Sequence, residues 1–534
     1  MSPQTRRSFF KTSSITSAGL AALAISSNTS TPVFAAPNEI SYGVVTPDSK
    51  QWQDLRQGTN LRWIGTPSRI AFPRNTEEVI TELNTVINLG LRPTVRSGGH
   101  CYEDFVSNND ISAIIDTSAM SYVKWDDERQ AFEVGAGTQL GHVYQLLYKQ
   151  WGVYVPAGNC PTVAAGGHIA CGGYGSMNRR DGLVVDYLQA VEVVHVNADG
   201  TISASTGTRD PHDPHHELWW GHTGGGGGNF GIVTRYWLRT PNLSTYTPES
   251  ALPTPPSQVI VSTVAWPWKL IDESRFTQLL SNHGSWHEKH ADAGTPEAGL
   301  FSQLKLNHKS TGYITMDTIV DAGVSDAEGV LDRYIATLAE NVGQPEIRQR
   351  RTVPWMQATQ WTGFTGPDST RRFDGKSAYL RRTWTTEAIK GAYKSLANTE
   401  KKLSGALLMI ASYGGAVNRV SPTDTVVPQR DSIIKFQVVS IWDNKSDDDI
   451  NIQWTRKTYS TMFASTGGVP IPNDNTDGAF VGYADTDLDD PTLNTSGWSA
   501  HALYYKDNLK RLIDVKRKYD PNNIFKHSQS LPVA

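Results

Sequence analysis

Two residues with nucleophilic side chains lie in glycine-rich segments of this 534-residue chain. His100 ends the segment Arg96-Ser97-Gly98-Gly99-His100, and Cys160 lies in Gly158-Asn159-Cys160-Pro161-Thr162. Successive backbone N–H groups with few side chains in the way are suited to binding a pyrophosphate. A lone histidine is more often structural, and a lone cysteine is more often a small buried hydrophobe. The segments therefore predict an anion-binding surface and leave the role of the imidazole and the thiol open.

Three more glycine-rich segments follow the same pattern. The second segment continues through Val163-Ala164-Ala165-Gly166-Gly167-His168, and Gly172-Gly173-Tyr174-Gly175 comes shortly after it. The five glycines at 224–228 precede Asn229-Phe230-Gly231-Ile232-Val233, and aromatic and β-branched neighbours favour a tight turn against a cofactor over a flexible linker. The segment 135–141 reads GxGxxxG, whose spacing differs from the dinucleotide fingerprint, so we expect no Rossmann site there.

Hydrophobic periodicity predicts the elements that position these segments. Apolar residues at helical spacing predict a helix within 72–90, which leads into a strand at 91–95 before the first glycine turn. The runs 111–116 and 131–135 read as strands and 139–149 as a helix. The run 188–202 reads as a hairpin with an Asp-Gly turn. This alternation indicates layered strands and helices in the first part of the chain.

The second part of the chain begins at a proline-rich seam, Pro248 to Pro256. We expect strands at 260–266 and 433–442 and a helix at 330–340 beyond it. The stretch 503–519 predicts one basic amphipathic helix whose charges form a solvated face. Two domains or one bilobed fold are expected at this length.

Composition excludes several function classes. Lys and Arg total 49 against 53 for Asp and Glu, a net charge of −4, so charge gives no reason to expect nucleic acid as a partner. A small molecule fits better as a partner. The three cysteines, Cys101, Cys160 and Cys171, form neither a disulfide framework nor a zinc-binding spacing.

The N-terminus predicts export. Thr5-Arg6-Arg7-Ser8-Phe9-Phe10-Lys11 precedes a weakly apolar stretch at 15–25, and Val33-Phe34-Ala35 offers small residues for cleavage. Residues 1–36 are therefore expected to be a twin-arginine signal peptide that directs the folded protein out of the cytoplasm. No later segment reaches the roughly 20 apolar residues of a membrane span.

Together the motifs resemble those of the berberine-bridge-enzyme-like flavoproteins of the vanillyl-alcohol-oxidase superfamily. The similarity rests on RSGGH at 96–100, GNCPTV…GGH…GGYG at 158–175, GGGGGNFGIVT at 224–234 and KYDPNNIF at 518–525. Within the family, the chain resembles bacterial oxidases of antibiotic biosynthesis of the aclacinomycin and tirandamycin oxidase kind. The resemblance implies an α+β fold: a two-lobed FAD-binding domain of the vanillyl-alcohol-oxidase type, and a substrate domain with an antiparallel sheet flanked by helices. We expect these domains at 37–247 and 248–500, with 501–534 returning to the FAD domain.

The resemblance also implies FAD attached covalently at two points, through its 8α-methyl carbon to His100 and through ring carbon 6 to Cys160. Two bonds would prevent loss of the cofactor after export and make it a stronger oxidant. Ala164 and Cys171 depart from the family's glycines, and Ala165 occupies the position that influences oxygen access. The remaining expected cofactor-binding residues lie in the same motifs: Arg96, Ser97, Gly98, Gly99, Gly158, Thr162, Val163, Gly166, Gly167, His168, Gly172, Gly173, Tyr174, Gly231, Ile232, Val233 and Tyr483.

The catalytic residues are expected in the second part of the chain. Phe480 to Asp487 resembles the family's Tyr-x-Asn-Tyr-x-Asp element, although Phe480 and Gly482 depart from it, and this gives Tyr483 the role of base. Tyr413, in a Ser-Tyr-Gly-Gly motif, is the expected partner tyrosine. Lys435 and Gln437 match a strand motif of the family and are further candidates.

The chemistry that this implies is the oxidation of a hydroxyl group to a ketone on a polyketide-type antibiotic or its sugar, with O2 reduced to H2O2. A tyrosine with an ordinary pKa near 10 needs a neighbouring hydrogen bond or ammonium group before it acts as a base. Lactone formation by a sugar oxidase, and oxidative ring closure or desaturation, are the alternatives. A flavin-carrying or carbohydrate-binding protein without turnover is less well supported, because both candidate tyrosines are present. Four tryptophans are candidates for a stacking platform for sugar rings, although tryptophans are as often core residues: Trp266, Trp268, Trp355 and Trp361.

Overall fold

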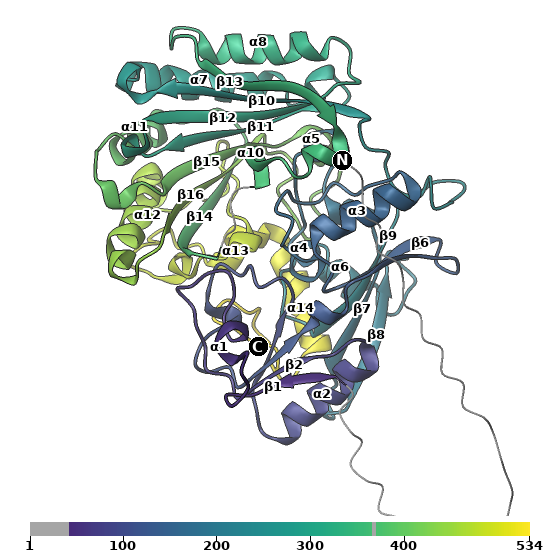
Figure 1. Ribbon diagram of the computed structural model, residues 1–534. Coiled ribbons are helices and arrows are strands. Elements are labelled where there is room, and N and C mark those ends of the chain that lie inside the picture. Colours follow the sequence, from purple (N-terminus) through teal and green to yellow (C-terminus); the bar gives the residue numbers. More distant parts are fainter. Residues whose placement is uncertain (1–41, 366–369, 534) are drawn as a thin grey trace, which may run out of the picture. The chain divides into compact units, whose positions relative to one another are not determined.

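Three β-sheets organise the chain in the computed structural model, which describes residues 42–365 and 370–533 (Figure 1). The predicted signal peptide at 1–36 lies outside the described residues. The first sheet has the order β1-β2-β4-β3, in which β1 runs antiparallel to β2 and the other neighbours are parallel. Its strands are β1 (Gly43–Val45), β2 (Arg69–Phe72), β3 (Pro93–Arg96) and β4 (Ala113–Asp116).

The other two sheets are antiparallel throughout. The five-stranded sheet has the order β5-β6-β9-β7-β8. Its strands are β5 (Val123–Asp126), β6 (Ala131–Gly135), β7 (Leu188–Val196), β8 (Ile202–Thr208) and β9 (Ile232–Leu238). The seven-stranded sheet has the order β13-β10-β12-β11-β15-β16-β14. Its strands are β10 (Gln258–Pro267), β11 (Leu300–Asn307), β12 (Tyr313–Asp321), β13 (Glu346–Pro354), β14 (Arg372–Leu380), β15 (Ala406–Ser412) and β16 (Ile434–Trp442).

Helices cover these sheets. Those of the first part of the chain are α1 (Trp52–Leu55), α2 (Thr76–Asn88), α3 (Leu140–Trp151), α4 (Ala165–Ala170), α5 (Asn178–Asp181) and α6 (His216–Gly221). Those of the second part are α7 (Glu273–Lys289), α8 (Ala327–Ala339), α9 (Trp355–Ala358), α10 (Thr362–Thr365), α11 (Thr386–Leu396) and α12 (Asp448–Met462). Two helices, α13 (Ala500–Tyr505) and α14 (Leu509–Tyr519), precede the C-terminus. None of the helices in the described ranges has the length and apolar character needed to cross a membrane.

The elements around the first glycine turn form as predicted. Asn75 caps α2 by accepting a hydrogen bond from the amide of Glu78, and Val79, Leu83 and Val86 are fully buried along one face of the helix. The hairpin β7–β8 also forms, and Gly200 adopts a φ of +84° in its Asp-Gly turn. The helix therefore presents its apolar stripe to the core and delivers the chain into β3 and the glycine turn.

The GxGxxxG segment packs closely against neighbouring backbone, in line with the expectation that it is no Rossmann site. A side-chain carbon added at Gly137 would lie 2.0 Å from the carbonyl oxygen of Thr117. The segment therefore presses against neighbouring backbone, and a dinucleotide would find no space there.

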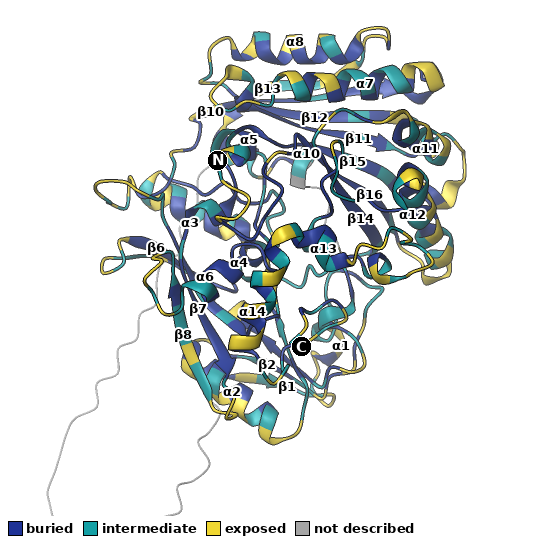
Figure 2. Ribbon diagram, turned by 180° about the vertical axis from the view of Figure 1, so that it is seen from behind, coloured by how far each residue is buried: buried dark blue, intermediate teal, exposed yellow. Residues whose placement is uncertain are grey.

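The structure confirms three elements that were predicted in the second part of the chain. The strand at 260–266 is β10, the strand at 433–442 is β16 and the helix at 330–340 is α8. Helices α7, α8, α11 and α12 lie along one face of the seven-stranded sheet (Figure 1). The strands beneath them are largely buried, whereas the outer sides of the helices are exposed (Figure 2). The fold class is therefore α+β, as expected. From Tyr42 onward the chain forms one compact unit, so the domain boundaries at 247/248 and 500/501 stay predictions.

The single tail helix predicted at 503–519 is wrong. The chain breaks at Lys506, which has a φ of +48°, and the side-chain amide of Asn508 donates to the carbonyl oxygens of Pro422 and Val426. These tertiary contacts outweigh the local helical pattern. The expected solvated charge is also wrong at Lys516, which is fully buried and lies 2.5 Å from the carboxylate of Asp520.

Candidate active site

The two loops that carry His100 and Cys160 meet at one threonine. The Nε2 atom of His100 lies 3.0 Å from Thr162 Oγ1, and Cys160 Sγ lies 3.5 Å from the same oxygen. His100 follows β3, whereas Cys160 and Thr162 come from the segment between α3 and α4. An imidazole and a thiol that are 60 residues apart in sequence therefore share one small, solvent-accessible region.

The close approach of the loops depends on Gly98. A side-chain carbon at this position would lie 2.6 Å from the amide nitrogen of Ala164 and 3.0 Å from the carbonyl oxygen of Thr162. Any side chain at this position would push the two loops apart. Ala164 has φ −103° and Cys171 has φ −92°, conformations that any residue adopts, so these two departures from glycine carry no backbone strain.

The next glycine turn has a different requirement. Gly172 and Gly173 have φ angles of +103° and +63°. A side-chain carbon at Gly173 would lie 2.2 Å from Val184 and 2.8 Å from the imidazole of His168. Both backbone conformation and space therefore demand glycine here.

Several of the predicted cofactor-binding side chains are used to shape the turns. Arg96 pairs with Asp116 at 2.5 Å, and Ser97 Oγ donates to the carbonyl oxygen of Ala136 at 2.7 Å. His168 Nε2 accepts from the amide of Gly158 at 2.9 Å, and burial lowers the pKa of His168 to about 4. A neutral imidazole is the form that accepts this bond.

The other predicted positions fix the backbone around the turns. The carbonyl oxygen of Val163 accepts from the amide of Leu140 at the start of α3, and that of Gly166 accepts from the Tyr236 hydroxyl at 2.8 Å. Gly231 has φ +146° and leads into β9, where Ile232 and Val233 pair with β7. Ala165 begins α4 and is buried.

The loops leave room and donors for a bound group. A side-chain carbon at Gly167 or Gly227 would meet no atom within 4 Å, although both glycines lie in otherwise buried stretches and are exposed. The amides of Gly98 and Gly99 find no hydrogen-bond acceptor within residues 42–365 and 370–533. Free amides beside open glycine backbone suit a pyrophosphate and a flat ring system. The residues present therefore fit FAD.

An aromatic cluster adjoins this region. The hydroxyl of Tyr483 lies 2.5 Å from that of Tyr174, and its ring stacks on Tyr102 with 4.9 Å between centroids. The amide of Gln437 on β16 donates to the Tyr102 hydroxyl at 2.7 Å. Tyr102 comes two residues after His100, and Tyr174 follows the Gly172–Gly173 turn. The proposed base thus contacts one residue next to the His100 loop and one residue of the glycine turn at 172–175.

Lys435 lies beneath this cluster. Only 1% of the residue is exposed, and its Nζ has no hydrogen-bond partner within the described part of the chain. Nζ lies 3.4 Å from the ring centroid of Tyr174, 3.1 Å from that of Phe480 and 4.8 Å from that of Tyr483. Burial lowers the pKa of Lys435 well below its ordinary value. Cation–π contacts with the rings partly stabilise the charged form of the side chain.

Tyr413 lies apart from Tyr483. Its ring packs edge-on against Tyr379 at 5.2 Å, and its carbonyl oxygen accepts from Arg179 at 2.8 Å. The predicted pairing of Tyr483 with Tyr413 is therefore wrong, because the hydroxyl that meets Tyr483 is that of Tyr174. Tyr413 and Tyr379 form a second tyrosine pair that reaches the cluster through Phe480, 6.4 Å from Tyr379.

Sequence reasoning missed Tyr102 and a buried pair of carboxyl groups behind the cluster. Glu103 accepts from the amide of Thr486 at 3.2 Å, and Asp485 bonds to Lys376 Nζ at 2.7 Å. Burial and the charge of Asp485 raise the pKa of Glu103 to about 8, and burial raises that of Asp485 to about 6. Their closeness in sequence to His100 and Tyr483 was the available signal.

The four tryptophans that are candidates for a sugar platform are core residues. Trp266, Trp268, Trp355 and Trp361 are all at most 6% exposed. The indole N–H of Trp266 donates to the carbonyl oxygen of Gly343, and that of Trp268 donates to Asn307. These rings therefore support the sheet and its edges.

Comparison with known proteins supports the same assignment. Residues 67–205 match the family model described as "FAD binding domain", and residues 479–532 match "Berberine and berberine like". The chain is 43% identical to the aclacinomycin-N/aclacinomycin-A oxidase of Streptomyces galilaeus over 90% of this chain and 88% of that protein. It is 30% identical to the hexose oxidase of Chondrus crispus over 91% of this chain and 94% of that protein.

A solved structure shows the same fold over almost the whole chain. It is that of a glycopeptide hexose oxidase complexed with teicoplanin, which is 41% identical, superposes with a TM-score of 0.87 and covers 92% of this chain and 99% of that one.

Proposed function

The chain belongs to the berberine bridge enzyme-like FAD-linked oxidases, and we propose that it oxidises a hydroxyl group of a polyketide-type antibiotic or its sugar to a ketone. The observation that carries the proposal is the Tyr483–Tyr174 hydroxyl contact of 2.5 Å, in a phenol pair that stacks on Tyr102, two residues after His100. Two similar proteins support the substrate class. One is the aclacinomycin-N/aclacinomycin-A oxidase, and the other is the glycopeptide hexose oxidase whose structure contains teicoplanin. The two electrons removed from the substrate are passed to O2, which is reduced to H2O2.

We infer that FAD is held covalently by His100 and Cys160. Bound FAD supplies the two-electron acceptor of the reaction. Support for the double attachment is the convergence of the imidazole and the thiol on Thr162, at 3.0 and 3.5 Å. Gly98, Gly99, Gly167 and the turn at 224–228 would receive the rest of the cofactor.

Tyr483 is assigned the removal of the substrate's hydroxyl proton, in concert with Tyr174. Burial raises the pKa of Tyr483 well above 10 and that of Tyr174 to about 12, so a solitary phenolate is disfavoured in either position. A short bond between the two oxygens stabilises one phenolate shared by the pair. When Lys435 is protonated, its charge beneath the rings adds to this stabilisation, and Gln437 holds Tyr102 against Tyr483.

A peroxide assay tests the reaction class. The purified holoenzyme is offered glycosylated and aglycone polyketide alcohols, and separately free hexoses and oligosaccharides. Peroxide release with the first set and a ketone product support the proposal. Lactone formation from the sugars alone would favour the second candidate, a sugar oxidase, which the hexose oxidase of Chondrus crispus suggests. Activity on neither set would contradict both.

The residue roles have their own tests. Tyr483→Phe and Tyr174→Phe should each lower kcat by about a hundredfold or more, whereas Tyr393→Phe, which removes a partly exposed hydroxyl from α11, should not change it. Wild-type turnover in Tyr483→Phe would remove the assignment. Protein precipitated with acid should stay yellow in the wild type and lose its colour in the double variant His100→Ala/Cys160→Ala.

We also propose export through a twin-arginine signal at residues 1–36, which rests on Arg6-Arg7 and the apolar stretch behind them. Replacement of both arginines by lysine should retain the protein in the cytoplasm. Unchanged export of that variant would contradict the proposal.

A further inference from the structure

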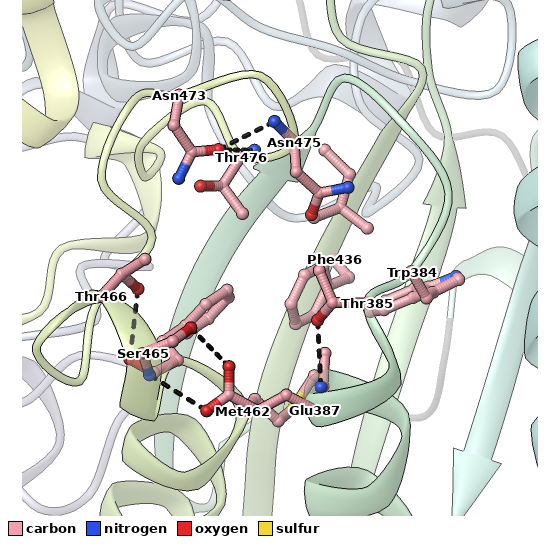
Figure 3. Close-up of a pocket in the computed structure, with 13 residues that line it drawn as sticks. Trp384, Thr385, Glu387, Phe436, Met462, Ser465, Thr466, Asn473, Asn475 and Thr476 are labelled. Atoms are coloured by element: carbon pink, nitrogen blue, oxygen red, sulfur yellow. Dashed lines mark hydrogen bonds between the residues drawn. The ribbon is translucent and has the colours of Figure 1, made fainter.

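A cavity of about 110 Å³ has a lining that includes no residue of the cofactor loops (Figure 3). The start of α11, the end of α12 and the loop 473–476 surround it. Leu380 of β14 and Phe436 of β16 form part of its wall. Nothing in the catalytic assignment above uses this cavity.

The cavity and the catalytic cluster lie on opposite faces of the same two strands. Phe436 lines the cavity, whereas its neighbours Lys435 and Gln437 contact the tyrosine cluster. Successive side chains of a strand point to opposite faces, so the sheet itself separates the two regions. A ligand in the cavity would therefore not occupy the catalytic face.

One wall of the cavity is apolar. The rings of Trp384 and Phe436 contact each other with 4.9 Å between centroids, and Leu380 and Met462 extend this surface. Such a wall suits the C–H face of a saturated ring.

The facing rim carries two amide side chains with unused hydrogen-bonding capacity. Asn473 Oδ1 accepts from the amides of Asn475 and Thr476, both at 2.8 Å, while its Nδ2 has no acceptor among the described residues. Asn475 Nδ2 donates to the carbonyl oxygen of Thr383 at 2.7 Å, which leaves Asn475 Oδ1 to accept. Both free atoms turn toward the open space in Figure 3. The turn thus fixes the donor of Asn473, and the carbonyl oxygen of Thr383 fixes the acceptor of Asn475.

The charge of the lining restricts the ligand further. Glu387 is the one ionisable group among the described lining residues, and its carboxylate accepts from the amide and the hydroxyl of Ser465. With a carboxylate and no cation in the lining, an anionic ligand is disfavoured. An uncharged ligand that offers hydroxyl groups meets all the features of the wall and the rim.

We propose that this cavity is an accessory binding site for one uncharged pyranose unit. The apolar face of the ring lies against Trp384 and Phe436, and its hydroxyl groups bond to Asn473 Nδ2 and Asn475 Oδ1. A cavity of about 110 Å³ that is partly open holds a single ring and excludes a fused polyketide. This inference does not depend on the substrate or on the redox reaction of the catalytic face.

The loop that forms the rim of the cavity is hydrogen-bonded to β14 and leads along the chain to Tyr483. The amide of Tyr379 donates to the carbonyl oxygen of Gly478, and the amide of Asp477 donates to that of Tyr379, each at 3.0 Å. The loop that holds Asn473 is thereby bonded to the strand that carries Tyr379 and runs on to Tyr483.

The test measures binding of methyl β-D-glucopyranoside to the holoenzyme by saturation-transfer NMR and calorimetry. Asn473→Asp keeps the Oδ1 acceptor that shapes the turn and replaces the two N–H donors with a carboxylate oxygen, so the Kd should rise about tenfold or more. Asn75→Asp is the matched control, because Asn75 also caps through Oδ1 and lies at the start of α2. The control should bind as the wild type does.

A second measurement uses the wild type alone. Methyl β-D-glucuronide should bind at least about tenfold more weakly than the glucoside, since its carboxylate meets Glu387. Equal Kd values for Asn473→Asp, Asn75→Asp and the wild type would overturn the proposal. So would the absence of saturable binding up to the solubility limit of the glucoside, or equal affinity for glucoside and glucuronide. The rate of peroxide release by Asn473→Asp should equal that of the wild type. The sugar-binding result can then be judged independently of whether the proposed oxidation is correct.

Discussion

Replacing Lys435 by methionine should stabilise the folded protein at neutral pH while it lowers activity. Methionine has a similar length and no charge, so the aromatic packing around the side chain is kept. The wild-type Nζ is buried without a hydrogen-bond acceptor in the described chain and has only ring faces, at 3.4 and 3.1 Å, to stabilise its charge. Cation–π contacts return about 2 kcal/mol, whereas removing an ammonium group from water costs several kcal/mol. Desolvation therefore wins, and the variant should gain about 1 kcal/mol or more.

The pH dependence follows from the direction of the pKa shift. Burial places the pKa of Lys435 in the folded protein well below the 10.5 of the unfolded chain. Between these two values the unfolded state binds more protons, so wild-type stability rises with pH. The advantage of Lys435→Met should be largest below the folded pKa and should shrink as the pH approaches 10.5.

Activity should change in the opposite direction. A positive charge 4.8 Å from the Tyr483 ring stabilises a phenolate by about 3 kcal/mol at an effective dielectric constant of about 20. Loss of this charge should lower kcat by about a hundredfold at pH values where wild-type Lys435 is protonated.

Thermal unfolding and peroxide-linked kinetics between pH 5 and 10 check both expectations, with Lys390→Met on the exposed side of α11 as the control. That control should stay within about 0.5 kcal/mol of the wild type. The reasoning would be refuted by a Lys435→Met protein that is less stable than the wild type at neutral pH, or by a difference in stability that grows toward pH 10.

Three further outcomes are expected. Glu103→Gln should be as stable as the wild type near pH 4.5 and more stable by a few kcal/mol near pH 8. Burial raises the pKa of Glu103 to about 8, so that ionisation of this carboxyl group destabilises the folded wild type. Urea unfolding at the two pH values measures the difference in stability, and a difference that does not change with pH would contradict the reasoning. Lys516→Met should cost about 3–5 kcal/mol by leaving Asp520 buried without its cation, and calorimetry should show no such loss for exposed Lys510→Met. Gly173→Ala should lower stability by about 2 kcal/mol or more and reduce flavin content, since the residue has φ +63° and abuts Val184; full flavin loading would refute the stated need for glycine.

The cofactor side of the site could be predicted from the sequence because its determinants are local. A turn such as 96–100 is written in consecutive residues, and glycine there reports both the absence of a side chain and the freedom of the backbone. The same locality made α2 and the β7–β8 hairpin predictable. The close contact between Gly98 and Ala164 is not local, and only the order of the motifs suggested that the two loops meet.

The pairing of the tyrosines was beyond sequence reasoning for a physical reason. A motif identifies a tyrosine but does not determine which way its hydroxyl points, and that direction depends on contacts from distant segments. Arg179 fixes the backbone of Tyr413, and Tyr379 packs against its ring. Tyr174 emerges from a glycine turn 309 residues before Tyr483 and meets it hydroxyl to hydroxyl. The wrong prediction for the tail has the same origin, since the buried ammonium group of Lys516 donates to the carbonyl oxygens of the distant Asn229 and of Phe525 as well as to Asp520.

The residues directly after His100 connect the holding of the cofactor to the placement of the base. Tyr102 stacks on Tyr483, and Glu103 bonds to the amide of Thr486 just beyond it. A shift of the loop that attaches His100 would therefore move both contacts of the Tyr483 segment, while Tyr174 would hold the hydroxyl from the other glycine turn. The base is thus positioned by the segment that follows His100 and by the glycine turn that carries Tyr174. The residues that would attach the cofactor and the residues that position the base therefore belong to connected segments. Gly98 is the point at which the His100 loop meets the loop that carries Cys160.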